Sequence, residues 1–210
     1  MAQLDGFSKI IHNGKEVGEV LHQGKTVWSD VYLAKDSDFV KVGIHWVYRG
    51  AEKEVEIPTH INGVLVTSTQ RMFSGSSDHQ ATPVTKVVLR HSNVNNMGWT
   101  FYEAKATTLD LSDFNTTNVT DMSNMFLLSK ATTLNLSGFN TYKVTDMSHM
   151  LRETIAKTLD LSSFNTTNVK YTSYMFYLSK ATIGYARTQT DANKFNTSSN
   201  KPTGLNFVVK

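Results

Sequence analysis

The sequence predicts a repeat protein of the α+β class: a solenoid of short parallel strands, preceded by a small antiparallel β-meander. One observation is a Thr-Leu-Asp/Asn-Leu-Ser unit that occurs three times, with 25 residues between equivalent positions. Another is a pair of glycine-containing turn signals between apolar segments within the first 30 residues. Self-similarity at a fixed period indicates stacked units, none of which buries its apolar face without its neighbours. We therefore expect one continuous core along the repeats.

The repeated unit opens with an alternating segment that fits a half-buried strand. It stands at Thr108–Ser112 and returns at Thr133–Ser137 and Thr158–Ser162. Leu109 and Leu111 point to one face and the polar residues to the other, because side chains alternate along a strand. A period of 20–29 residues with a Leu-x-Leu core lies in the leucine-rich-repeat range. The predicted architecture is therefore a leucine-rich-repeat-like solenoid.

The second half of the unit is expected to return across the opposite face. Phe114 lies at the end of the strand segment and is predicted to enter the core. Asn115 suits the turn that follows, where its side chain can bond backbone groups. Thr120 or Asp121 is expected to cap a short helical turn, with the apolar side chains of Met122–Phe126 facing inward.

Four segments follow from this division. We assign residues 1–30 to an N-terminal β-hairpin module and residues 31–83 to a divergent capping region. The 25-residue repeats occupy residues 84–185, and residues 186–210 form a C-terminal cap. Within that cap, Leu205–Val209 has the apolar character of a closing strand over the last exposed core face.

The N-terminal module is predicted from a short internal echo. Ile10–Lys15 contains Asn-Gly, and Val20–Lys25 contains Gln-Gly in the equivalent place. Asn-Gly between apolar segments is a strong hairpin signal, because both central residues tolerate positive φ. The meander is expected to end at Trp28. Since so small a sheet is marginal alone, we expect it to pack on residues 44–48, on the repeats or on another subunit, and the last would give a homo-oligomer.

Composition narrows the classes of partner. Charged residues make up 19% of the chain, and 21 Lys and Arg stand against 18 Asp and Glu. No run of Lys or Arg appears, so the basic stripe that nucleic-acid binding needs is missing. The polar surface is instead rich in Thr, Ser and Asn, which suits neutral hydroxyl-rich ligands.

Other features are expected from absences in the sequence. There are no cysteines, which removes disulfides and thiolate chemistry. No apolar run approaches the ~20 residues of a membrane-spanning helix, so we expect no membrane insertion. The N-terminus lacks the basic and apolar regions of a signal peptide.

The repeat resembles a known family. The pattern from Leu109 through Phe126 resembles the BspA-like leucine-rich repeats of bacterial surface proteins, which are abundant in lactobacilli and mycoplasmas. The segment Ile57–Val64, which leads to Met72-Phe73, is similar to that family's other repeat form. The resemblance covers roughly residues 50–185. It implies an adhesin or binding protein.

The opening segment resembles something else. His12–Val17 and His22–Trp28 look like short modules in tail- and baseplate-associated proteins of phages that infect Gram-positive bacteria. This likeness implies a virion tail protein. The absence of a signal peptide and of a wall-sorting motif departs from the bacterial surface family and is what a phage structural protein would show.

No catalytic, cofactor or metal site is expected. None of the seven histidines has a metal-binding spacing, and His149 with Glu153 fits a solvated pair. Asp110 and Asp160 fall in one column two repeats apart, which places them about 10 Å from each other across strands ~4.8 Å apart. That distance exceeds the separation of a glycosidase pair, and the neutral Asn135 lies between them.

The same column is the predicted ligand-binding face, because its outward side chains form a flat polar lattice. The lattice comprises Thr108, Asp110, Ser112, Thr133, Asn135, Ser137, Thr158, Asp160 and Ser162. Tyr142, Tyr171 and Tyr174 replace the residues usual at their repeat positions and suit sugar stacking or subunit contact. A merely hydrated sheet face and a capping role for the tyrosines are the alternatives.

The predicted function is non-enzymatic adhesion or receptor binding, as a phage tail-associated protein that recognises a Gram-positive cell surface. Its partners would be a surface polysaccharide or protein, and other virion tail proteins. It would act on the virion tail or at the extracellular surface. The alternatives are a fragment of a bacterial surface adhesin that binds protein or host, and a structural virion spacer without a ligand.

Overall fold

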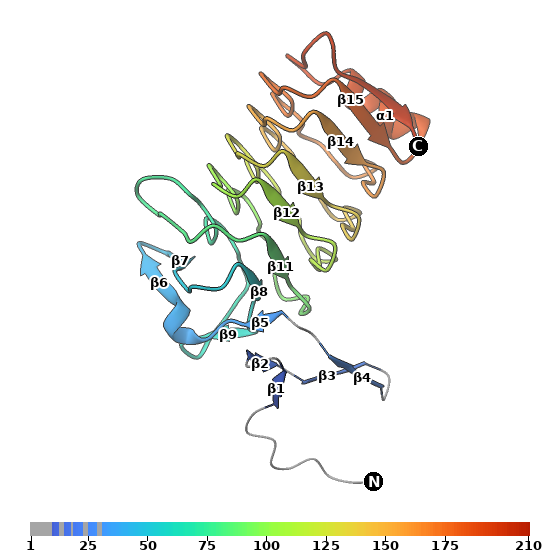
Figure 1. The fold of residues 1–210 in the computed structure, drawn as a ribbon. Coiled ribbons are helices and arrows are strands. Elements are labelled where there is room, and N and C mark those ends of the chain that lie inside the picture. The colour runs from blue at the N-terminus through green and yellow to red at the C-terminus, as the bar shows by residue number, and fades with distance from the viewer. Residues whose placement is uncertain (1–9, 13–14, 18, 23–24, 29–30) are drawn as a thin grey trace.

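The chain forms a β-solenoid of about seven turns (Figure 1). The computed structural model describes the backbone of residues 10–12, 15–17, 19–22, 25–28 and 31–210, and the side chains of residues 31–210. Short strands follow one another along the solenoid in chain order. Between them the chain makes a full circuit, so each coil rests on the one before.

Eight short strands form one side of the solenoid. A five-stranded parallel sheet contains β5 (Tyr32–Leu33), β8 (Glu54–Glu56), β11 (Lys86–Val88), β12 (Thr108–Asp110) and β13 (Thr133–Asn135). A three-stranded parallel sheet contains β14 (Thr158–Leu161), β15 (Ile183–Ala186) and β16 (Asn206–Val209). Thr108 lies opposite Thr133, and Thr158 opposite Ile183, so one 25-residue repeat makes one coil. The predicted parallel strands are confirmed, and β16 is the closing strand.

The remaining strands form antiparallel pairs. They are β1 (Ile10–His12) with β2 (Lys15–Val17), β3 (Glu19–His22) with β4 (Lys25–Trp28), β6 (Phe39–Val42) with β7 (His45–Tyr48), and β9 (His60–Ile61) with β10 (Val64–Leu65). In the described part of the N-terminal module, β1–β2 and β3–β4 are separate sheets, so the predicted continuous meander is not confirmed. The turn residues 13–14 and 23–24 lie outside the described residues.

Helix is scarce, so the predicted α+β class is not confirmed. The described chain holds one α-helix, α1 (Gln189–Asn196), and one 3-10 turn, η1 (Asp36–Asp38). The helical turn predicted after Asp121 is absent. Asp121 instead forms isolated parallel bridges to Asn96 and Asp146, and its Oδ1 accepts a hydrogen bond from the Ser123 N–H at 2.8 Å. Asp121 therefore caps a turn rather than a helix.

The turns replace the helix because their backbone groups bond the next coil. The Asn124 N–H donates to the Ser148 carbonyl, and the Phe126 N–H donates to the Met150 carbonyl, each at 2.9 Å. A helix would bond these groups within its own segment, leaving the neighbouring carbonyls to find other partners. We call this side, residues 97–104, 122–129, 147–154 and 172–179, the turn face, and the opposite side, formed by the strands, the strand face.

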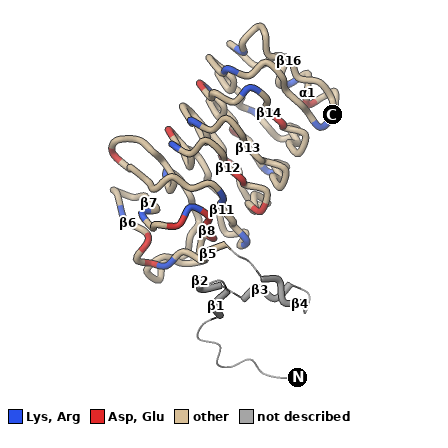
Figure 2. The backbone as a smooth tube through the Cα atoms, viewed as in Figure 1, with Lys and Arg blue, Asp and Glu red and all other residues tan. Residues whose placement is uncertain are grey.

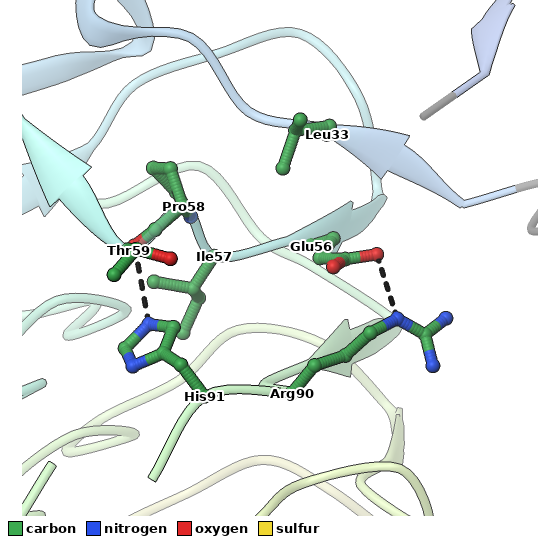
Figure 3. A pocket seen from close by; sticks show the side chains of 7 residues that line it. All are labelled: Leu33, Glu56, Ile57, Pro58, Thr59, Arg90 and His91. Atoms are coloured by element: carbon green, nitrogen blue, oxygen red, sulfur yellow. Dashed lines mark hydrogen bonds and ion pairs between the residues drawn. The ribbon is translucent and has the colours of Figure 1, made fainter. Parts of the chain in front are cut away.

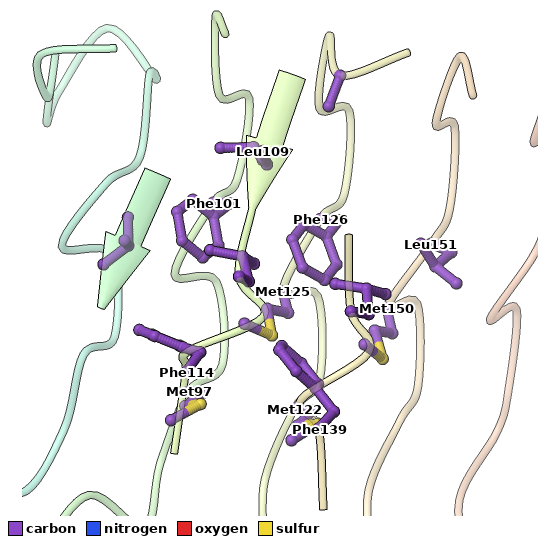
Figure 4. Packing of buried hydrophobic residues seen from close by; sticks show 14 of the residues in the cluster. Met97, Phe101, Leu109, Phe114, Met122, Met125, Phe126, Phe139, Met150 and Leu151 are labelled. Atoms are coloured by element: carbon purple, nitrogen blue, oxygen red, sulfur yellow. The ribbon is translucent and has the colours of Figure 1, made fainter. Parts of the chain in front are cut away.

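Columns of like side chains fill the space between the two faces (Figure 4). The rings of Phe73, Phe101 and Phe126 stack in sequence, with centroids 5.4 and 5.5 Å apart. Phe114 and Phe139 begin a second column, with centroids 6.2 Å apart. The predicted methionine column at 125, 150 and 175 is fully buried. One core therefore runs through the coils, as the repeat predicts.

Hydrogen-bonded columns hold the corners. The Asn115 Oδ1 accepts from the Thr117 N–H at 3.1 Å, which confirms the predicted role of this asparagine. The buried Thr116 hydroxyl donates to the Asn140 carbonyl at 2.9 Å. At the last repeat, Asp191 of α1 takes the place of that carbonyl. Its Oδ1 accepts from the Thr166 N–H at 2.9 Å and hydroxyl at 2.7 Å, so α1 closes the C-terminal end.

Within the described residues, no helix is long and apolar enough to cross a membrane.

Candidate ligand-binding site

The strand face brings most of the predicted lattice into register. Asp110 lies opposite Asn135, directly beside the Thr108–Thr133 pair. Thr158 and Asp160 occupy the equivalent places on β14, but β14 belongs to the other sheet. Within the described residues the strand pairing is interrupted between β13 and β14. The lattice therefore consists of two parts with an opening between them.

Many of the lattice's polar groups bond one another. The Asp110 Oδ1 accepts from the Ser112 hydroxyl at 2.8 Å and from the Asn135 Nδ2 at 2.9 Å. The Asp160 Oδ1 likewise accepts from the Ser162 hydroxyl at 2.6 Å. Sequence reasoning missed these bonds, which occupy acceptors that a ligand would otherwise use.

These contacts set the charge of both carboxyl groups. Burial alone would raise the pKa of Asp110, but hydrogen bonds from Ser112 and Asn135 and the Lys86 charge together hold that pKa below its usual range. Burial opposes ionisation of Asp160 too, yet its bonds from Lys210 and Ser162 lower its pKa. Both groups are therefore anionic at neutral pH.

A cavity of about 240 Å³ lies at the opening between β13 and β14. Its lining is Leu134, Asn135, Leu136, Ser137, Asp160, Ser162 and Ser163. Four of these seven are predicted lattice residues. The Lys210 Nζ lies 2.5 Å from the Asp160 Oδ2 at its edge. The cavity therefore offers hydroxyls, an amide and a carboxylate to a small polar group.

The threonines of the lattice retain free hydroxyls. Thr108, Thr133 and Thr158 are exposed. Within residues 31–210 none of their hydroxyls has a hydrogen-bond partner, whereas the hydroxyl of nearby Thr132 donates to the Thr107 carbonyl at 3.1 Å. A ligand laid along the strand face would meet these three groups first.

The three predicted tyrosines do not join the lattice. Tyr142 and Tyr171 are 56% and 58% exposed, and neither ring contacts another aromatic ring in residues 31–210. Tyr174 lies on the turn face, where its ring stacks on His149 with centroids 5.3 Å apart. Sequence reasoning also missed Trp99 and its turn-face neighbours. The sequence feature that could have revealed these residues is the spacing of Trp99 and Tyr174, which lie three repeats apart.

A larger cavity of about 430 Å³ lies where β5, β8 and β11 end (Figure 3). Its polar groups bond each other: the Arg90 Nε donates to the Glu56 Oε2 at 3.1 Å, and the His91 Nε2 lies 3.2 Å from the Pro58 carbonyl. That carbonyl only accepts, so Nε2 carries the proton. Burial lowers the pKa of His91, which is therefore neutral. No predicted site residue lines this cavity.

Charge is dispersed over the described coils, with acidic and basic residues interspersed (Figure 2). Among the described residues, no group of three or more His, Asp and Glu side chains is placed to hold a metal ion.

Comparison with known proteins identifies the repeat. Residues 67–189, more than half of the chain, match the family described as "Mycoplasma protein of unknown function, DUF285". This family is typically found in BspA-like repeat surface proteins. Neither the curated proteins nor the solved structures contain a match. The chain, with its 25-residue coils and in-register strands, belongs to the DUF285 family.

Proposed function

We propose that the protein is a non-enzymatic receptor-binding protein that attaches to a hydroxyl-rich polymer on a bacterial cell surface. The observation that carries this proposal is a set of unpartnered threonine hydroxyls beside the polar cavity: Thr108 and Thr133 in register on β12 and β13, and Thr158 at the equivalent place on β14, across the opening. Parallel strands repeat such groups every ~4.8 Å. Several weak contacts on a rigid frame then add up to useful affinity.

The carboxyl groups of the strand face support binding rather than catalysis. A glycosidase needs a general acid whose pKa is raised towards neutrality. The pKa values of Asp110 and Asp160 are instead lowered by their hydrogen-bond donors. Their fixed negative charge suits hydrogen bonds from sugar hydroxyls.

The test replaces the three free hydroxyls without changing the shape of the strands. A Thr108→Val/Thr133→Val/Thr158→Val variant removes hydrogen-bonding groups and keeps β-branched side chains that favour strands. We expect binding at least about 10-fold weaker to cells that the native protein sediments with, since three lost bonds at about 0.5–1.5 kcal/mol each amount to at least about 1.5 kcal/mol. Thr117→Val, an exposed threonine on a corner, is the matched control. Native affinity in the triple variant would contradict this use of the strand face.

Two settings fit this activity. The DUF285 match over residues 67–189 favours a bacterial surface adhesin. A phage tail-associated protein rests on His12–Trp28, whose side chains lie outside the described residues, and stays a prediction. Tail and baseplate genes beside this gene would support the virion setting; export and anchoring genes or segments would support the adhesin.

A further inference from the structure

Two aromatic pairs with the same geometry lie on the turn face. The rings of Trp99 and Tyr102 meet edge to face, with centroids 4.9 Å apart and planes at 84°. The rings of Tyr174 and Tyr177 do the same at 5.5 Å and 85°. Each member of the second pair stands three 25-residue repeats after its counterpart in the first. The pairs are therefore equivalent positions on coils about 14 Å apart, at ~4.8 Å per coil.

An arginine from the preceding coil lies over both rings of the first pair and over one ring of the second. The Arg71 guanidinium lies 4.7 Å from the Trp99 ring centroid and 5.7 Å from that of Tyr102. The Arg152 guanidinium lies 5.2 Å from the Tyr177 ring centroid. Cation–π contact holds each guanidinium over its ring, and a guanidinium has further N–H groups that can donate hydrogen bonds. Within residues 31–210 the Arg71 side chain has no hydrogen bond or ion pair.

The backbone beneath the rings opposes bulky residues. Trp99, Asn124, His149 and Tyr174 occupy one column, and each has a positive φ, between 54° and 62°. Among non-glycine residues, asparagine suits this left-handed region best, as at Asn124. Aromatic residues at Trp99 and Tyr174 therefore cost conformational free energy. The same left-handed φ occurs at Leu128 and Leu178, so it belongs to the repeated turn, and two coils carry aromatic residues there at that cost.

Charges of both signs lie beside each pair. The Arg152 Nε donates to the adjacent Glu153 Oε1 at 3.0 Å, and near the first pair the Lys105 Nζ lies 4.0 Å from the Glu103 Oε2. Neither pair therefore faces a cluster of like charges that would select a strongly charged ligand. Tyr174 is 41% exposed, and neither cavity described above is lined by these aromatic residues. Trp99, Tyr102 and Tyr177 are half-buried. Partly exposed rings with nearby donors, rather than a deep apolar pocket, suit flat, hydroxylated rings.

We propose that the Trp99–Tyr102–Arg71 group and the Tyr174–Tyr177–Arg152 group form a bivalent site for a neutral polysaccharide. Sugar rings stack on the aromatic side chains, and the arginines donate hydrogen bonds to sugar hydroxyls. Two like groups on one rigid face match a polymer whose unit repeats, because one chain can engage both. This inference rests on the proposed function, and it assigns the ligand class and a second contact surface.

The test uses Trp99→Asn, Tyr174→Asn and the double variant. Asparagine occupies the equivalent position at Asn124, so the fold accepts it, and circular dichroism with thermal melting checks each variant. The probes are a soluble β-1,4-glucan, β-1,3-glucan, α-1,6-glucan and β-1,4-galactan, together with neutral polysaccharide purified from cells that the native protein sediments with. Binding is measured in solution with short and long chains of each.

We expect at least one long neutral glycan to bind the native protein. Each single variant then loses about 100-fold in affinity for that chain, because avidity is lost, and the double variant does not bind it measurably. Disaccharides, which reach only one group, bind native and single-variant proteins within a few-fold. Thr117→Val, at an exposed corner position outside both groups, leaves affinity unchanged.

Three results would overturn the inference: no neutral probe binds the native protein, the variants bind like the native protein, or protease treatment of cells abolishes binding while their glycans remain. The last two leave the proposed receptor-binding function standing. Absence of binding to any cell would instead reject that function, whatever the isolated glycans show.

Discussion

The strand face and the turn face of the same coils follow different rules. On the strand face the residue type barely changes, with Thr, then Asp or Asn, then Ser in each repeat. On the turn face the backbone stays the same while the side chain changes from Trp99 to Asn124, His149 and Tyr174. Strand-face residues bond their neighbours, so the architecture constrains them. Turn-face positions constrain φ, which leaves the chemistry of their side chains free to vary.

The largest expected effect on stability comes from α1, which closes the C-terminal end of both faces. Asp191 is 2% exposed and accepts from Thr166, Thr188 and Arg187. Asp191→Asn presents an amide to these donors and should lower the free energy of unfolding by about 3–5 kcal/mol, because it breaks a buried charged network. Chemical denaturation measures the change. Asp36→Asn, at an exposed position, is the control; equal stability of both variants would contradict the capping role.

The next largest effect on stability is expected at Gly138, where two coils approach each other closely on the strand side. A Cβ at Gly138 would lie 1.8 Å from the Ser112 carbonyl oxygen. Gly138→Ala must therefore push two coils apart and should cost about 1–3 kcal/mol in thermal or urea unfolding. Gly204→Ala, with no heavy atom within 4 Å, should be neutral or slightly stabilising. If Gly138→Ala were as stable as the native chain, the coils would not be packed as described.

The turn face predicts a smaller difference that depends on backbone alone. Leu178 is 51% exposed and has a φ of 54°. Leu178→Val places a β-branched residue in the left-handed region, whereas Leu178→Asn places a favourable one there. The asparagine variant should be more stable than the valine variant by about 1–2 kcal/mol. Matching melting temperatures would show that the positive φ is not imposed by the ladder of turns.

The smallest expected effect concerns the pH range in which titratable groups of each face change the stability of the protein. Burial, and then the Arg152 charge, lower the pKa of His149 in the folded chain. Its stabilising contribution is therefore complete above the unfolded value near 6.5 and is lost as pH falls through the folded pKa. The lowered pKa values of Asp110 and Asp160 act only below about pH 4. His149→Asn should flatten the pH dependence of stability between pH 7 and 5; an unchanged slope would contradict this.

The sequence predicted features whose causes lie within one repeat or recur at a fixed period. The parallel register of Thr108 with Thr133, the buried methionine column and the turn bonds of Asn115 are of this kind. The prediction of a helical turn after Asp121 was wrong, because the same type of capping residue begins both a helix and a β-turn. The hydrogen bonds that decide between them run to the next coil and leave no local signal.

The candidate sites were predicted less completely. Alignment placed Asp110 beside Asn135 but did not reveal that the two side chains bond each other. Trp99 and Tyr174 keep the 25-residue period, but Asn124 and His149 stand between them, so the aromatic residues do not recur in every repeat. Arg71 lies 28 residues before Trp99, so the 25-residue period does not relate the two. The sequence keeps its 25-residue period from β13 to β14. It therefore gives no sign of the opening between these two strands.

The most direct measurement is sedimentation of labelled native protein with a panel of whole lactic-acid-bacterial and mycoplasma cells, beside the Trp99→Asn/Tyr174→Asn variant. We expect strain-selective, saturable binding that purified surface polysaccharide competes away. We also expect the double variant to lose far more affinity than the strand-face triple valine variant. Folded native protein that binds none of the cells would contradict a receptor-binding function.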